Sequence, residues 1–136
     1  IVDATAQKKI ITYLESLGYE TIYQSTGFSN HLHPIDGLGR IDFVYVAGET
    51  AARIFQDVRR VKVFSDQSCA VVSPEHLAAL KIYAMANDPE RTFREMADLT
   101  FLISLPDVDM AAIKTSFQKY DQMDKFDALL EKSGKQ

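Results

Sequence analysis

Asp42 combines a reactive side chain with a setting that would hold it rigid. It lies between Ile41 and Phe43 in the clearest strand pattern of the sequence, residues 40–46, with Arg40 on the same face. A carboxylate aimed from a strand into a cleft could bind a divalent metal ion or act as a general base. Alternatively, Asp42 is an exposed acid that pairs with Arg40 on the solvated face of a sheet.

A second group of charged residues falls on two predicted helices. Lys81 is the only charged residue in the segment 77–86 and lies beside its apolar stripe. It either extends its amine to solvent along a buried stem or holds phosphate oxygens as a partly desolvated ammonium. Arg91, Arg94 and Asp98 share one helical face at spacings of three and four residues. They form either a solvated salt-bridge ladder or a site where the arginines contact phosphate and Asp98 orients a base or a substrate group.

Histidine and cysteine supply weaker signals. His31 and His33 could lie on one side of an extended segment, as a zinc site would need, but the sequence offers no convincing third and fourth ligands. Cys69 is the only cysteine, which excludes an internal disulfide and fits a reducing compartment. Its apolar, strand-like surroundings predict a small buried side chain.

Composition indicates a globular domain. The chain has 136 residues, of which 46% are apolar and 25% charged, enough for a core without disulfides or metals. The net charge of −4 argues mildly against a nucleic-acid surface, although a local basic patch stays open. We see no signal peptide and no membrane-spanning run, and we therefore expect a cytoplasmic protein without a membrane partner.

The element pattern predicts an α+β fold. We expect a small mixed β-sheet flanked by helices over residues 1–72, and a helical region over residues 73–136 packed on it as one compact unit. Strands are expected at 19–25, 40–46, 60–64 and 69–72, whereas residues 27–39 read as irregular because glycine, proline, serine and asparagine follow one another closely. Ser73-Pro74-Glu75 is a clear helix start.

Several short motifs, each weak alone, follow one another in a recognisable order. They are Leu17-Gly18-Tyr19, the run from Thr21 to Ser25, Phe28, His33-Pro34, the run from Gly37 to Phe43, the run from Val71 to Glu75, Leu80-Lys81, the run from Ala86 to Pro89, Arg91, and Ala97-Asp98-Leu99. Together they resemble the AbiEii/AbiGii-type toxin branch of the nucleotidyltransferase superfamily. The resemblance covers about residues 1–105 and the C-terminal helices more loosely.

This resemblance implies a partial nucleotidyltransferase-like fold and a set of roles. In the superfamily, a Gly-Ser motif precedes an Asp-x-Asp pair, and a third acid on a later strand completes a Mg²⁺ site around a nucleoside triphosphate. Asp42 matches the third acid, and Lys81 and Asp98 match the family's helical lysine and aspartate, which act on the nucleotide phosphates and near the attacking group. Arg40, Arg91 and Arg94 become candidates for binding the substrate.

This sequence has no Gly-Ser motif and no Asp-x-Asp pair on a predicted strand; its one Asp-x-Asp, at Asp107 and Asp109, falls at a predicted helix start. We expect either that the sequence starts just after the two missing motifs, with Ile1-Val2 as the end of their strand, or that it is a natural remnant. One carboxylate cannot hold the catalytic metal ions alone, so the chain by itself should be inactive.

Two functions therefore stay open. In the first, the parent protein transfers a nucleotide from a nucleoside triphosphate to an RNA or protein acceptor, as a bacterial toxin of a toxin–antitoxin or phage-defence system. In the second, the chain is a catalytically degenerate binding module that contacts a partner protein such as an antitoxin. A metal-binding domain built on His31 and His33 is a third hypothesis.

Overall fold

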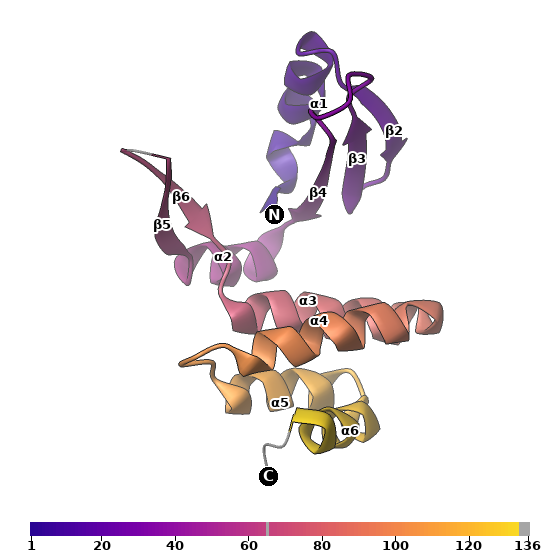
Figure 1. Cartoon of the computed structure of the whole chain (residues 1–136), viewed down its shortest axis with the longest axis vertical. Helices are drawn as coiled ribbons and strands as arrows, with labels where there is room; N and C mark the ends of the chain where they lie inside the picture. The colour runs from indigo at the N-terminus through magenta and orange to yellow at the C-terminus, as the bar shows by residue number, and fades with distance from the viewer. Residues whose placement is uncertain (65, 134–136) are drawn as a thin grey trace. The chain divides into compact units, whose positions relative to one another are not determined.

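The computed structural model describes residues 1–64 and 66–133 and confirms the α+β organisation (Figure 1). A mixed four-stranded sheet with helices comes first, and a helical region follows. Residues 134–136 of the predicted helical region lie outside the described residues. The chain divides into two compact units, Ile1–Asp57 and Val58–Gln136, which we call the sheet unit and the helical unit.

The sheet unit is built on strands in the order β1-β4-β3-β2. β1 runs parallel to β4, and the two other pairs are antiparallel. Three helical segments complete this unit. Its elements are β1 (Val2–Asp3), η1 (Ala4–Ala6), α1 (Gln7–Ser16), β2 (Glu20–Gln24), β3 (Phe28–Leu32), β4 (Arg40–Val46) and α2 (Gly48–Gln56).

The prediction that residues 27–39 are irregular was wrong for β3. Its sequence, Phe-Ser-Asn-His-Leu, has no β-branched residue, so local propensity does not mark it as a strand. Backbone pairing with β2 on one side and β4 on the other decides its conformation. Side chains alternate along β3: Ser29 and His31 are buried, whereas Phe28 and Leu32 are exposed. A strand in the middle of a sheet therefore carries a polar buried face.

Gly18 ends the first helix as the sequence predicts. Its φ of +88° lies in the left-handed region, which glycine adopts without a Cβ penalty. A Cβ at this position would also meet the ring of His33, with Nε2 only 3.0 Å away. Backbone conformation and space both favour glycine at the turn into β2.

The helical unit packs four α-helices around a shared apolar core, and Figure 1 shows α3 and α4 side by side. Its helical elements are α3 (Pro74–Asn87), η2 (Pro89–Arg91), α4 (Thr92–Ser104), α5 (Met110–Lys119) and α6 (Met123–Ser133). The predicted start of α3 is confirmed, because the Ser73 hydroxyl accepts a hydrogen bond from the His76 amide at 3.3 Å. No helix within residues 1–64 and 66–133 is both long and apolar enough to cross a membrane.

A two-stranded hairpin precedes these helices, formed by β5 (Arg59–Phe64) and β6 (Gln67–Val71). The prediction that Cys69 is buried was wrong: Cys69 pairs with Val61 across the hairpin and is exposed. All five residues of β6 are exposed, because a two-stranded ribbon has no second layer of its own to cover its faces. The apolar surroundings that suggested burial are neighbours in the chain, and they do not enclose the thiol.

Candidate functional site

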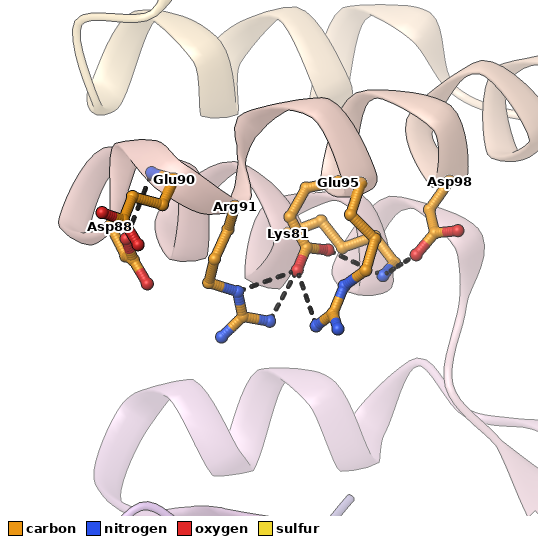
Figure 2. A network of polar contacts seen from close by, with 7 residues as sticks. Lys81, Asp88, Glu90, Arg91, Glu95 and Asp98 are labelled. Atoms are coloured by element: carbon orange, nitrogen blue, oxygen red, sulfur yellow. Dashed lines mark hydrogen bonds and ion pairs between the residues drawn. The ribbon is translucent and has the colours of Figure 1, made fainter.

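Lys81 and Asp98 come together on the neighbouring helices α3 and α4. The Lys81 ammonium donates hydrogen bonds to the Asp98 carboxylate and to Glu95 Oε2, the latter at 2.9 Å. Asp98 is half-exposed, Lys81 is largely covered, and Glu95 is buried. Figure 2 shows the lysine reaching from α3 to both acids of α4. The sequence placed Lys81 and Asp98 in candidate roles, and the fold makes them direct partners.

Two arginines converge on the same buried acid. Arg91 donates to Glu95 Oε1 through Nε at 3.0 Å and through Nη2 at 2.5 Å. Arg94 reaches the same oxygen through Nη2 at 3.5 Å, and its side chain is 73% exposed. We call the five residues Lys81, Arg91, Arg94, Glu95 and Asp98 the charged cluster; Figure 2 labels all of them except Arg94. It holds three cations and two carboxylates, and Glu95 lies at its centre.

Glu95 is the residue that sequence reasoning missed. It lies on the face of α4 that also carries Leu99, Leu102 and Ile103, all of which are buried. Spacings of four, seven and eight residues define that face, so a glutamate in this register is an acid on an apolar stripe. Such an acid is rarely buried unless cations pair with it. With Arg91 one turn before it, this pattern was available in the sequence.

Cations and burial act in opposite directions on the groups of the cluster. Burial raises the pKa of Glu95, but hydrogen bonds from Lys81 and Arg91 outweigh it and hold that pKa below its ordinary value of 4.5. Burial lowers the pKa of Lys81, but hydrogen bonds to Asp98 and Glu95 outweigh it and raise that pKa above 10.5. Glu95 and Lys81 are therefore both charged across the physiological range.

We expect the stability contributed by Glu95 to be lost only in acid. A depressed folded-state pKa stabilises the fold fully above the unfolded-state pKa, and this stabilisation disappears as the pH falls below 4.5 through the folded-state value. The raised pKa of Lys81 has the opposite sign, because its contribution is full below 10.5 and is lost as the pH rises through the folded-state value. NMR titration of the Glu95 side-chain carboxyl carbon measures the first effect. A midpoint above 4.5 would contradict the pairing.

Asp42 belongs to the other unit, where it pairs with two neighbours. Its Oδ1 accepts hydrogen bonds from Arg40 Nε at 2.7 Å and from Asn30 Nδ2 at 2.6 Å. The hydrogen bond from Arg40 is the main reason that the pKa of Asp42 lies below its ordinary 3.8. Asp42 and Arg40 are both about half-exposed. The structure thus brings Asp42 and Arg40 together in the sheet unit, and Lys81, Arg91, Arg94 and Asp98 together in the helical unit.

A magnesium ion does not fit the described residues on their own. Mg²⁺ takes near-octahedral oxygen coordination, usually with one or two carboxylates together with phosphates and waters. Within residues 1–64 and 66–133, no three histidine, cysteine, aspartate or glutamate side chains gather where they could hold a metal ion. Asp42 offers a single carboxylate, already paired with Arg40. A magnesium site at Asp42 would therefore need further acids from outside the described residues.

Each histidine of the zinc hypothesis has its own set of contacts. His31 is fully buried, with Thr21 Oγ1 at 3.1 Å from Nδ1 and Ser29 Oγ at 2.7 Å from Nε2. The His33 ring packs edge-on against Tyr19, and its Nδ1 accepts a hydrogen bond from the Ile35 amide at 3.0 Å. Residues two apart on one strand share a face, but β3 ends at Leu32, so His33 lies outside the strand that holds His31. Both rings serve the local fold.

No protein-family model matches the sequence, and a search of the curated proteins finds no match to it.

Proposed function

We propose that the charged cluster binds the phosphate groups of a nucleotide and that the chain is part of a nucleotidyltransferase of the AbiEii/AbiGii-like type. One observation carries this proposal: Lys81 and Asp98, which the resemblance assigns to phosphate binding and to the attacking group, form an ion pair on adjacent helices. Arg91 and Arg94, the other candidates for binding the substrate, lie in the same cluster. Residues singled out from separate stretches of sequence thus support one site.

The cluster has hydrogen-bond capacity left for an anion. An ammonium has three donors, and Lys81 uses one each for Glu95 and Asp98. A guanidinium has five N–H donors, and Arg94 uses one of them, at the long distance of 3.5 Å. Glu95 keeps the three cations close together before any ligand arrives, which lowers the cost of ordering them around a phosphate. The remaining donors can bind phosphate oxygens with charge-assisted hydrogen bonds.

The proposed reaction transfers a nucleotide from a nucleoside triphosphate to an RNA or protein acceptor. The acceptor oxygen forms a bond to the α-phosphorus, and the bond from that phosphorus to the pyrophosphate breaks. Lys81, Arg91 and Arg94 bind the phosphates, and the half-exposed Asp98 orients the attacking hydroxyl. The resemblance assigns Mg²⁺ to Asp42 together with an acid pair, and a metal ion held by such acids would supply positive charge.

Replacing Arg94 by glutamine should weaken phosphate binding without unfolding the protein. Because one charge-assisted hydrogen bond is lost, ATP and inorganic tripolyphosphate should bind about tenfold more weakly to Arg94→Gln, measured by isothermal titration calorimetry without divalent metal. The exposed position of Arg94 should keep the change in unfolding free energy below about 1 kcal/mol. Arg53→Gln removes the same charge from an exposed pair with Glu49 and serves as the control.

Equal losses in the Arg94 and Arg53 variants would show that only net charge matters and would contradict a specific site. For the reaction itself, the chain extended by its natural upstream coding sequence should transfer label from a radiolabelled nucleoside triphosphate, and Asp42→Ala should abolish that transfer. Absence of label transfer from every nucleotide tested, or transfer that Asp42→Ala leaves unchanged, would refute the enzymatic proposal.

A second candidate function is a catalytically degenerate module that binds a partner protein such as an antitoxin. The observation that favours it is an exposed apolar strip on the sheet unit, where the rings of Tyr23 and Phe28 stack at 4.8 Å and Val44 pairs with Phe28. These three side chains are 40–50% exposed. Binding of a purified antitoxin that is lost in Phe28→Ser, together with no binding of ATP or tripolyphosphate, would favour this function over the enzyme.

A further inference from the structure

Phe101 lies on the same face of α4 as the charged cluster. It follows Asp98 by three residues and Arg94 by seven, and both spacings place side chains above one another on a helix. The Phe101 side chain is 65% exposed. Helical side chains lean toward the N-terminus, so the Phe101 ring leans along the face toward Asp98. A flat apolar surface therefore adjoins the polar site.

The order of groups along this face matches the order of groups in a nucleotide. Arg91 and Arg94 come first, Asp98 follows with the Lys81 ammonium paired to it, and Phe101 lies about 4.5 Å further along the axis of the helix. A nucleotide presents phosphates, then a sugar with hydroxyl groups, then a planar base. Aromatic rings stack on every base through the π-face, whatever the base edge presents. Cations, a carboxylate and an aromatic ring are thus arranged in the sequence that such a ligand needs.

Among the described residues, Phe101 forms no aromatic pair. The aromatic pairs of the helical unit join Tyr83 to Tyr120 and Phe117 to Phe126, and Phe101 belongs to neither. Phe93, on the same helix, is even more exposed, at 90%. Phe93, however, precedes Arg94 by one residue and Asp98 by five, so it points away from the face of the cluster. Phe93 and Phe101 are both exposed aromatic side chains, but they lie on different faces of α4.

From this geometry we infer that Phe101 is the stacking platform for the base of a nucleotide whose phosphates are bound by Lys81, Arg91 and Arg94. The inference rests on the proposed function and adds to it a recognition element for the base. Stacking is tolerant of base identity, so the platform selects nucleotides over bare polyphosphates and does not select one base strongly. It raises affinity for a purine and a pyrimidine triphosphate alike.

The test compares ligands with and without a base. ATP, CTP and inorganic tripolyphosphate are titrated into the full chain by calorimetry in the absence of divalent metal. Wild-type protein should bind both nucleotides about tenfold or more tightly than tripolyphosphate. Phe101→Ala should reduce nucleotide affinity to the level of tripolyphosphate and leave tripolyphosphate binding unchanged. Phe101→Tyr should keep the preference for nucleotides, and the matched control Phe93→Ala should behave as wild type.

Each outcome has a distinct meaning. If tripolyphosphate and nucleotides bind the wild type equally and Phe101→Ala changes neither affinity, base stacking on Phe101 is refuted, but phosphate binding by the charged cluster is not. If none of the three ligands binds, the proposed function and the platform fall together. If Phe101→Ala lowers the unfolding temperature or changes the hydrodynamic size, Phe101 is covered by protein, and the platform is overturned in that case too.

Discussion

Replacing Glu95 by alanine should destabilise the helical unit by about 3 kcal/mol. Glu95 is 1% exposed and accepts hydrogen bonds from Lys81, Arg91 and Arg94. Removing one partner of a buried ion pair costs about 3–5 kcal/mol, because the other charge stays behind without compensation. The lower end applies to Glu95, since Lys81 retains Asp98 and the arginines can turn to water. Urea unfolding followed by circular dichroism measures this loss.

Asp98→Ala is the matched control for this prediction. Asp98 also pairs with Lys81 from α4, but its side chain is half-exposed, so its loss should cost less than about 1 kcal/mol. The double variant Lys81→Met/Glu95→Met should recover part of the loss, because apolar side chains replace a buried pair at little cost. If the Glu95 and Asp98 variants lose the same stability, burial does not govern the cluster, and the prediction for Glu95 is wrong.

The second large effect concerns the buried polar face of the sheet. Replacing His31 by alanine should destabilise the sheet unit by about 3 kcal/mol, because it leaves a cavity and removes the partner of Thr21 and Ser29. Ser29 keeps the Tyr45 hydroxyl at 2.7 Å, which limits the loss. The chain contains no tryptophan, so amide hydrogen exchange in β3 and β4 is a better measure than intrinsic fluorescence.

His33→Ala is the control for the His31 variant. His33 is only partly buried; its ring packs against Tyr19 and its Nδ1 accepts a hydrogen bond from the Ile35 amide. Loss of these partly buried contacts should cost about 1 kcal/mol or less. A larger effect of His33→Ala than of His31→Ala would show that the Thr21–His31–Ser29–Tyr45 network does not hold the sheet together.

Local signals in the sequence predicted most of the elements. Ser73-Pro74 starts α3, Gly18 ends the first helix, and residues 40–46 form β4 as the alternation of side chains indicates. These features depend on neighbours a few residues apart, namely a capping hydroxyl, a left-handed glycine and a period of two. Such neighbours are visible in a sequence because the chain itself keeps them close.

The errors all concern contacts between distant residues. β3 exists because β2 and β4 pair with it on both sides, which its own composition does not reveal. Cys69 is exposed because a two-stranded ribbon has no second layer to cover its apolar residues. The sequence marks Glu95 as an acid on an apolar stripe, but its partner Lys81 comes from α3, fourteen residues away in the chain. In each case the environment comes from another part of the chain.

The sequence by itself determined the α+β class and two helix boundaries, the start of α3 and the end of α1. It also singled out Asp42, Lys81, Arg91, Arg94 and Asp98 as candidates for chemistry. Only the tertiary structure decided which of these residues lie in contact. Packing of α3 against α4 brings Lys81 to Asp98 and buries Glu95 between the cations, fourteen residues from Lys81 in the chain. The physical reason is that burial and ion pairing depend on distances in space, and only the packed core of the helical unit sets those distances.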